Sequence, residues 1–250
     1  MITKELISNR WTAIIGGLAT LVAALYFDYA YTLTKNALAG PNTSQMPLAT
    51  RSSLMHSLAN FETYSWMQWF HGDARLILAL VATFLGGSLI SNEVNKGTIF
   101  FVLSKAVSRE RILLIKYAVS ATILLMVTLL GSVGTLVAAA IQNHPLPIVP
   151  VLLSTMLLWV GTLAVLGVAL FFSTLLNDLF LPALLTICFV VLISIPAFLP
   201  DWKDWSLLSY WASLPAYQGT GFPLKEALVC ISSALIPLGA ALLLFRHKAY

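Results

Sequence analysis

The chain has 250 residues, of which 59% are apolar and only 10% are charged. A soluble domain carries about 25% charged residues, because its surface has to face water. The composition therefore excludes an ordinary soluble domain and indicates an integral membrane protein, with a single transmembrane domain over residues 1–250. The formal charge of +4 does not indicate nucleic-acid binding, because the basic residues gather beside apolar stretches, which is the pattern of membrane orientation.

Six apolar stretches approach the roughly 20 residues that a helix needs to cross a bilayer. They cover residues 11–31, 74–91, 118–141, 151–172, 179–199 and 227–245. The charged residues Asp28, Arg75 and Lys116 lie near the ends of stretches, where we expect their side chains to reach the lipid headgroups. The sequence thus predicts an all-α protein with six transmembrane helices.

The charge of the loops predicts the orientation. With the N-terminus in the cytoplasm, nine Lys and Arg residues lie on the cytoplasmic side and five lie outside. Cytoplasmic loops of membrane proteins carry an excess of Lys and Arg, so we expect both termini in the cytoplasm. Residues 91–117 then form the most basic cytoplasmic loop, which contains Lys96, Lys105, Arg109, Arg111 and Lys116.

Two longer segments, residues 32–73 and 200–226, are expected outside the membrane, and both are rich in aromatic residues. They include Trp66, Trp69, Trp205 and Trp211. Such residues form a belt at the interface between membrane and water, and this is the simpler interpretation. The alternative is an external lid whose tryptophans contact an amphiphilic substrate.

Motifs for catalysis are absent from the sequence. There is no phosphate-binding loop of the form G-x-x-x-x-G-K-[ST], no GxSxG and no HExxH. The central parts of the six stretches carry no carboxylate, which removes the usual sign of proton- or sodium-coupled transport. We therefore expect a protein that is not an enzyme, binds no cofactor or metal itself, and takes energy for any transport from another subunit.

The basic cytoplasmic loop carries a recognisable pattern. Residues 93–109 read EVNKGTIFFVLSKAVSR, and the segment is similar to the permease subunits of type-2 ABC transporters, the ABC-2 family. In that family a Glu ends the second span. It is followed by a Gly-Thr turn and by a short apolar helix that ends near Leu-Ser. A Ser-Arg pair then precedes a Lys in the third span. The matching residues here are Glu93, Gly97, Thr98, Leu103, Ser104, Ser108, Arg109 and Lys116.

The resemblance implies a fold and a set of partners. The loop around residues 98–109 would be a coupling helix that docks into an ATPase subunit, with Phe100 and Leu103 as buried contacts and Arg109 at the rim. Residues 1–10 would form a short interfacial elbow. Two permease halves, either two copies or a copy and a paralogue, would form the path beside lipid, and two separate ATPase subunits would bind ATP and Mg. The family consists chiefly of exporters, and the expected location is a prokaryotic inner membrane.

The local chemistry agrees with this interpretation but leaves alternatives open. Gly97 permits a turn, Thr98 can cap a helix over residues 99–105, and Ser108 can cap the third span with Glu110 in its first turn. The same loop can instead lie on the membrane, with its cations held by anionic headgroups. The rival functions are an ion-coupled carrier or channel without an ATPase, and a non-transporting assembly or immunity protein. The uncharged span centres favour an apolar or amphiphilic cargo.

Overall fold

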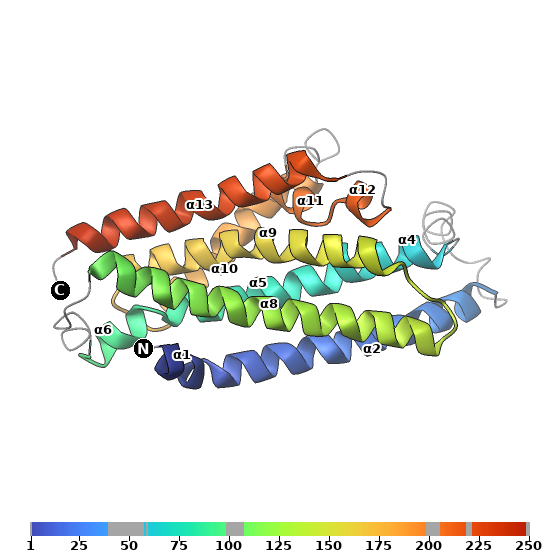
Figure 1. The fold of residues 1–250 in the computed structure, drawn as a ribbon, viewed down its shortest axis with the longest axis horizontal. Coiled ribbons are helices and arrows are strands. Elements are labelled where there is room, and N and C mark those ends of the chain that lie inside the picture. Colours follow the sequence, from blue (N-terminus) through green and yellow to red (C-terminus); the bar gives the residue numbers. More distant parts are fainter. Residues whose placement is uncertain are drawn as a thin grey trace.

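The computed structural model describes residues 2–39, 58, 60–98, 108–198, 206–218 and 222–248. Within these ranges every regular element is a helix, so the all-α prediction is confirmed. The long helices run side by side as an elongated bundle (Figure 1). At one end of the bundle lie α1 (Ile2–Ser8), α6 (Ser91–Asn95) and the last turn of α13 (Leu224–His247). At the other end lie α4 (Phe61–Ser65), α11 (Leu207–Trp211) and α12 (Leu214–Tyr217).

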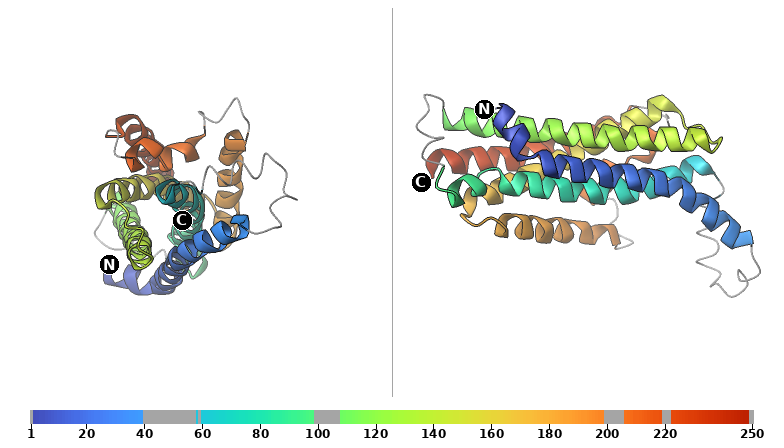
Figure 2. Two further views of the ribbon diagram at one scale, coloured as in Figure 1. Left: turned by 90° about the vertical axis from the view of Figure 1, so that its right-hand side faces the viewer. Right: turned by 90° about the horizontal axis from the view of Figure 1, so that it is seen from below.

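In the part of the chain that the structure describes, five helical segments are long and apolar enough to cross a membrane: Arg10–Asn36, Phe61–Asn95, Arg109–Ile141, Ile148–Leu175 and Leu224–His247. The fifth expected span, residues 179–199, is shorter than the others. It consists of α10 (Leu181–Ser194) and a 3₁₀ turn, η3 (Ile195–Phe198). Pro196 lies in this turn, and a proline cannot continue the α-helical ladder because it has no N–H. Figure 2 shows α10 running along the outside of the bundle.

The first span follows the expected elbow. The backbone bends at Asn9, between α1 and α2 (Arg10–Ala39), although the N–H of Asn9 still donates to the Glu5 carbonyl at 3.0 Å. One side of α2 packs on α8 (Arg109–Ile141) and on α5 (Ala74–Ser88). Its opposite side exposes large apolar side chains, including Trp11, Ile15, Leu18, Val22 and Leu25. In a membrane protein such a face contacts lipid or another apolar helix.

The second span is much longer than predicted. The expected stretch was 74–91, but a continuous helical path runs from Phe61 to Asn95 through α4, a π-helix η2 (Trp66–Asp73), α5 and α6. Residues 61–73, which we expected in an external segment, therefore belong to this helix. The aromatic side chains of that part supply the reason, because Phe61, Trp69 and Phe70 are buried in the core and burial of aromatic surface is strongly stabilising.

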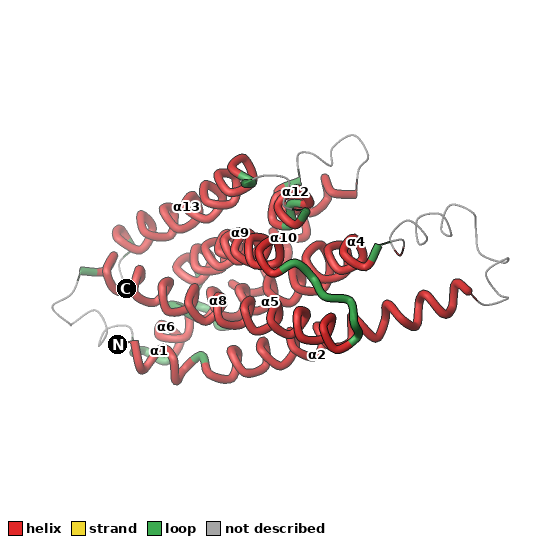
Figure 3. Tube along the Cα trace, turned by 45° about the vertical axis from the view of Figure 1, so that its right-hand side comes forward, coloured by secondary structure: helices red, strands yellow, loops and turns green. Residues whose placement is uncertain are grey.

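The helix α9 (Ile148–Leu175) forms the centre of the bundle and contacts α5, α8, α10 and α13. Buried hydroxyls and an indole tie it to α8. The Thr155 hydroxyl donates to the Ser132 hydroxyl at 2.8 Å, and the Trp159 indole N–H donates to the Ala121 carbonyl at 3.0 Å. Tyr117 on α8 donates its hydroxyl to the Leu163 carbonyl at 3.0 Å. Figure 3 shows α8 and α9 running side by side.

Side-chain caps begin two of the helices, and the one at Ser108 was expected. The Ser108 hydroxyl accepts from the N–H of Arg111 at 3.4 Å and begins α8. The Asp178 carboxylate accepts from the N–H groups of Phe180 and Leu181 at 2.8 and 3.0 Å, just ahead of α10. The hydrogen bonds from Leu181 and then Phe180 lower the pKa of this carboxyl below its ordinary value. The caps fix where the third span and the short α10 start.

Glycines allow close contacts between helices. A Cβ atom at Gly161 of α9 would lie 2.4 Å from Cγ of Trp211, and one at Gly131 of α8 would lie 2.8 Å from the Trp69 ring. Both tryptophans are therefore seated against bare backbone. Gly134 and Gly167 form similar close contacts, to Ala24 and to Pro237 respectively.

Candidate functional site

Five of the residues expected to couple to an ATPase are described, and they lie at the end of the bundle that carries α1 and the last turn of α13: Glu93, Gly97, Thr98, Ser108 and Arg109. Gly97 has a φ of +68°, which a glycine adopts without strain and other residues adopt rarely. The Thr98 hydroxyl donates to the Glu93 carbonyl at 3.4 Å. Phe100 and Leu103 lie outside the described residues, so the expected helix over residues 99–105 stays a prediction.

A buried ion cluster lies directly beside this loop. The ammonium of Lys116 is 2.7 Å from a carboxylate oxygen of Glu5 and 3.1 Å from one of Glu93. The three residues are 2%, 6% and 7% exposed. The prediction that Lys116 reaches the headgroups is therefore wrong, because its ammonium points inward to two carboxylates. The side chain of Asp28 is not among those described.

The cluster joins three separate segments: the elbow α1, the base of the second span and the base of the third span. Removing one partner from a buried ion pair leaves an uncompensated charge, which costs about 3–5 kcal/mol. Movement of the elbow away from α8 would break the contact between Glu5 and Lys116 in the same way. The cluster thus ties the elbow to the two helices that enter and leave the expected coupling loop.

Arg109 makes contacts within the chain. Its guanidinium donates to the Lys248 carbonyl at 2.7 Å, and the Lys248 ammonium donates to the carbonyls of Thr174 and Leu175 at 2.9 and 3.1 Å. These carbonyls end α9, where backbone acceptors have no partner within the helix. Burial lowers the pKa of Lys248 below its ordinary value. Arg109 therefore fastens the start of the third span to the C-terminal segment and, through it, to the end of α9.

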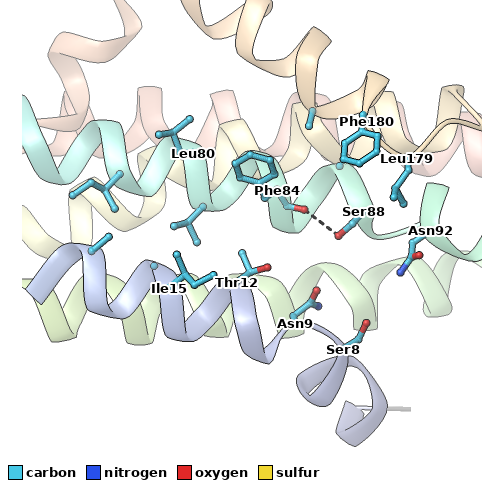
Figure 4. Close-up of a pocket in the computed structure, with 16 residues that line it drawn as sticks. Ser8, Asn9, Thr12, Ile15, Leu80, Phe84, Ser88, Asn92, Leu179 and Phe180 are labelled. Atoms are coloured by element: carbon cyan, nitrogen blue, oxygen red, sulfur yellow. Dashed lines mark hydrogen bonds between the residues drawn. The ribbon is translucent and has the colours of Figure 1, made fainter.

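Beside the ion cluster, a groove opens between α2, α5 and the start of α10, and Figure 4 shows the side chains that line it. Its volume is about 630 Å³. The walls are apolar along most of its length and carry Ile15, Ala19, Leu80, Phe84 and Phe180. The end nearest the termini is polar and carries Ser8, Asn9, Thr12, Ser88 and Asn92. An amphiphile matches such a gradient better than a uniformly polar or apolar molecule.

A second, polar cavity of about 190 Å³ adjoins this groove. It is lined by the ion cluster together with Ser8, Asn9, Ser88, Leu89, Asn92, Lys96 and Thr98. Four residues, Ser8, Asn9, Ser88 and Asn92, line both spaces. The apolar groove therefore leads into a charged chamber at the base of the bundle.

The external tryptophans are placed differently from one another. Trp69 and Trp211 are 1% and 0% exposed, so they are core side chains in this conformation. Trp66 is half-buried and its ring centroid lies 5.4 Å from that of His71. Trp205 lies outside the described residues. The lid interpretation stays a prediction for the four tryptophans, and packing accounts for the placement of Trp69 and Trp211.

The ion cluster is the feature that sequence reasoning missed. The signal was present, because Lys116 lies in an otherwise apolar run, and such a residue usually has a partner inside the protein. Two carboxylates, Glu5 and Glu93, lie in the segments that were expected in the cytoplasm. Among the described residues, no group of three or more His, Cys, Asp or Glu side chains is arranged to hold a metal ion.

The long apolar helices define a multi-pass membrane protein. The chain matches the family described as "ABC-2 membrane transporter related" over residues 12–176, about two thirds of its length. It belongs to this family, which confirms the resemblance seen in the sequence. No curated protein matches the chain significantly.

Proposed function

We propose that this chain is the permease subunit of an ATP-driven transporter, which moves an amphiphilic cargo and is powered by separate ATPase subunits. Membership of the ABC-2 family carries the proposal. The arrangement at the base of the bundle supports it, because the expected coupling loop begins and ends on helices that are tied to the elbow and to the C-terminal segment. Force applied to the loop would reach both α5 and α8 through these contacts.

The proposal includes six spans with both termini in the cytoplasm. The 14 residues of α10 and the four of η3 give a length of about 29 Å at 1.5 and 2.0 Å per residue. This matches the roughly 30 Å of a bilayer core. The α10 element therefore serves as the fifth span, despite being the shortest.

The proposal also includes two permease halves, formed by a second copy or by a paralogue, with two ATPase subunits that bind ATP and Mg. The exposed apolar faces of α2 and α10 flank the groove, so a second half placed on them would close the groove into a path shielded from lipid. Export is the direction we propose, because the polar end of the groove lies at the proposed cytoplasmic side.

One observation favours a second candidate, an ion-coupled carrier. Ionisable residues within membrane segments often mark ion pathways, and the ion cluster of Glu5, Glu93 and Lys116 is buried near the ends of two spans. In that case transport would depend on an ion gradient and not on ATP. Transport into inverted vesicles, with and without ATP and with the gradient collapsed, separates the two candidates.

The coupling loop provides the direct test. If Phe100 is buried in an ATPase cleft, Phe100→Ala should weaken the binding free energy between permease and ATPase by about 2 kcal/mol or more. Less ATPase should then co-purify, and hydrolysis should become uncoupled from transport. The matched control is Phe222→Ala, since Phe222 is exposed near the opposite end of the bundle. Parental co-purification and coupled hydrolysis in Phe100→Ala would contradict the proposal and leave the loop as a lipid-facing segment.

A further inference from the structure

The C-terminal end of α9 is bonded to the helix that leads into the expected coupling loop. Between α5, which ends at Ser88, and α6, which begins at Ser91, the helix is interrupted by a turn. The backbone N–H groups of Ile90 and Ser91 both donate to the hydroxyl oxygen of Ser173, each at 3.0 Å. Ser173 is 0% exposed, so these bonds are shielded from water. One buried hydroxyl of α9 therefore holds the base of the second span at its interruption.

The same end of α9 is bonded to the helix that leaves the loop. The Lys248 ammonium donates to the carbonyls of Thr174 and Leu175 at 2.9 and 3.1 Å, and it also donates to the side-chain oxygen of Asn177 at 3.1 Å. The guanidinium of Arg109, at the start of α8, donates to the Lys248 carbonyl at 2.7 Å. A cation is stabilised at this place because the last carbonyls of a helix carry partial negative charge. Lys248 thus connects the start of the third span to the end of α9.

Both connections end within three consecutive residues at the centre of the bundle, 173–175. The central helix α9 contacts α5, α8, α10 and α13, so a displacement of its end affects the packing of four other helices. The last turn of α13, which carries Lys248, is itself fixed on the bundle, because Phe245 is 1% exposed. The ion cluster ties the same two spans to the elbow and does not include α9. The contacts at 173–175 are therefore a separate connection.

We propose that the end of α9 is the junction through which movement of the coupling loop reaches the centre of the bundle, with Ser173 and Lys248 as its two positioning residues. Ser173 holds the arm that comes from the second span, and Lys248 holds the arm that continues into the third. The inference rests on the proposed function in treating residues 98–109 as the coupling loop.

Distances between spin labels on the purified full-length protein in detergent test the junction without an ATPase. In a background without Cys188 and Cys230, labelled cysteines at positions 111 and 175 report on the third-span arm, and labels at 95 and 175 report on the second-span arm. All three positions are exposed. Pulsed electron paramagnetic resonance then measures the share of molecules in which each distance is lengthened.

Each arm should be released by its own variant. Lys248→Met removes the ammonium and should raise the share of lengthened 111–175 distances about tenfold, or about 1.4 kcal/mol, because bonds from a charged donor are roughly twice as strong as neutral ones. The 95–175 distances should stay parental. Ser173→Ala should give the reverse pattern, with a rise of about fivefold at 95–175, because it removes two neutral hydrogen bonds.

Three further variants serve as controls. Lys248→Arg keeps a charged donor and should retain the parental 111–175 distances. Arg246→Met breaks an exposed ion pair of 3.7 Å beside Lys248, and Ser232→Ala removes an exposed hydroxyl that is bonded within its own helix; both should leave the two distances unchanged. Parental distances in Lys248→Met and Ser173→Ala, or an equal lengthening of both distances in each, would overturn the two-arm junction.

The complex with the co-purified ATPase tests whether the junction transmits movement. A fluorophore on a cysteine at Val149, which is exposed near the opposite end of α9, should respond to ATP and Mg in the parent. The double variant Ser173→Ala, Lys248→Met should keep the parental amount of ATPase, because neither residue lies in the loop, and should lose most of the response.

The outcomes separate this inference from the proposed function. A parental response in the double variant, with the ATPase bound, would overturn the junction and leave the proposed function standing. If no ATPase co-purified with the parent, the proposed function would fail, and the junction would fall with it because no movement would reach the loop.

Discussion

Replacing Lys116 with methionine should strongly destabilise the folded protein. Methionine has a similar volume and shape, so the packing of α8 changes little while the ammonium is lost. Glu5 and Glu93 would then remain as two buried carboxylates without their shared cation, which lies 2.7 and 3.1 Å from them. Breaking a buried ion pair on one side costs about 3–5 kcal/mol, and each kcal/mol shifts the melting temperature of a chain of this size by about 2–4 °C. We expect a decrease of about 10 °C.

The assay is thermal unfolding of the purified protein in detergent. Arg111→Met is the matched control, because Arg111 is exposed on the same helix, and its melting temperature should stay within about 2 °C of the parent. The triple variant Glu5→Gln, Glu93→Gln, Lys116→Met removes all three charges, and it should recover most of the loss, since an uncharged replacement of a buried cluster is often neutral. A melting temperature of Lys116→Met equal to that of Arg111→Met would refute the buried cluster. If the triple variant did not regain the melting temperature lost in Lys116→Met, unpaired charge would not be the cause of the destabilisation.

Two further predictions concern packing and orientation. Gly161→Ala should destabilise the protein by about 1–3 kcal/mol, because its Cβ would lie 2.4 Å from Trp211. The control is Gly239→Ala, which has free space around its Cβ and should be neutral or slightly stabilising. Equal melting temperatures of the two variants would contradict the close contact at Gly161. In a background without Cys188 and Cys230, a cysteine at Asn143 should react with a membrane-impermeant reagent in intact cells and one at Asn95 should not. The positive-inside rule gives this orientation, and labelling at position 95 would reverse it.

The number and position of most helices follow from the sequence, because lipid imposes a simple requirement: every backbone polar group must be bonded within the span. A run of about 20 apolar residues can satisfy it only as a helix or a strand of a barrel, so five of the expected spans, those at 11–31, 74–91, 118–141, 151–172 and 227–245, lie within long helices of the structure. Caps at Ser108 and Asp178 were also predictable, since their chemistry involves neighbouring residues only.

The lengths of the second and fifth spans were not predictable in the same way. Residues 61–73 contain polar side chains such as Gln68, His71 and Asp73, and by hydropathy they belong outside. In the structure Gln68 donates to Asp73 at 3.2 Å, and the aromatic side chains between them are buried against α8 and neighbouring elements. Tertiary contacts therefore decide that this segment is helical.

The sequence by itself determined the class of protein, the helical architecture and the family, because these depend on composition, on apolar runs and on a local motif around Glu93 and Gly97. Only the tertiary structure decided which charges meet. Glu5 and Lys116 are 111 residues apart and Arg109 and Lys248 are 139 apart, and no periodicity in the chain relates them. The cost of leaving a charge unpaired in a buried site selects such pairs, but the packing of α1 and α13 on the base of α8 determines which partners are within reach.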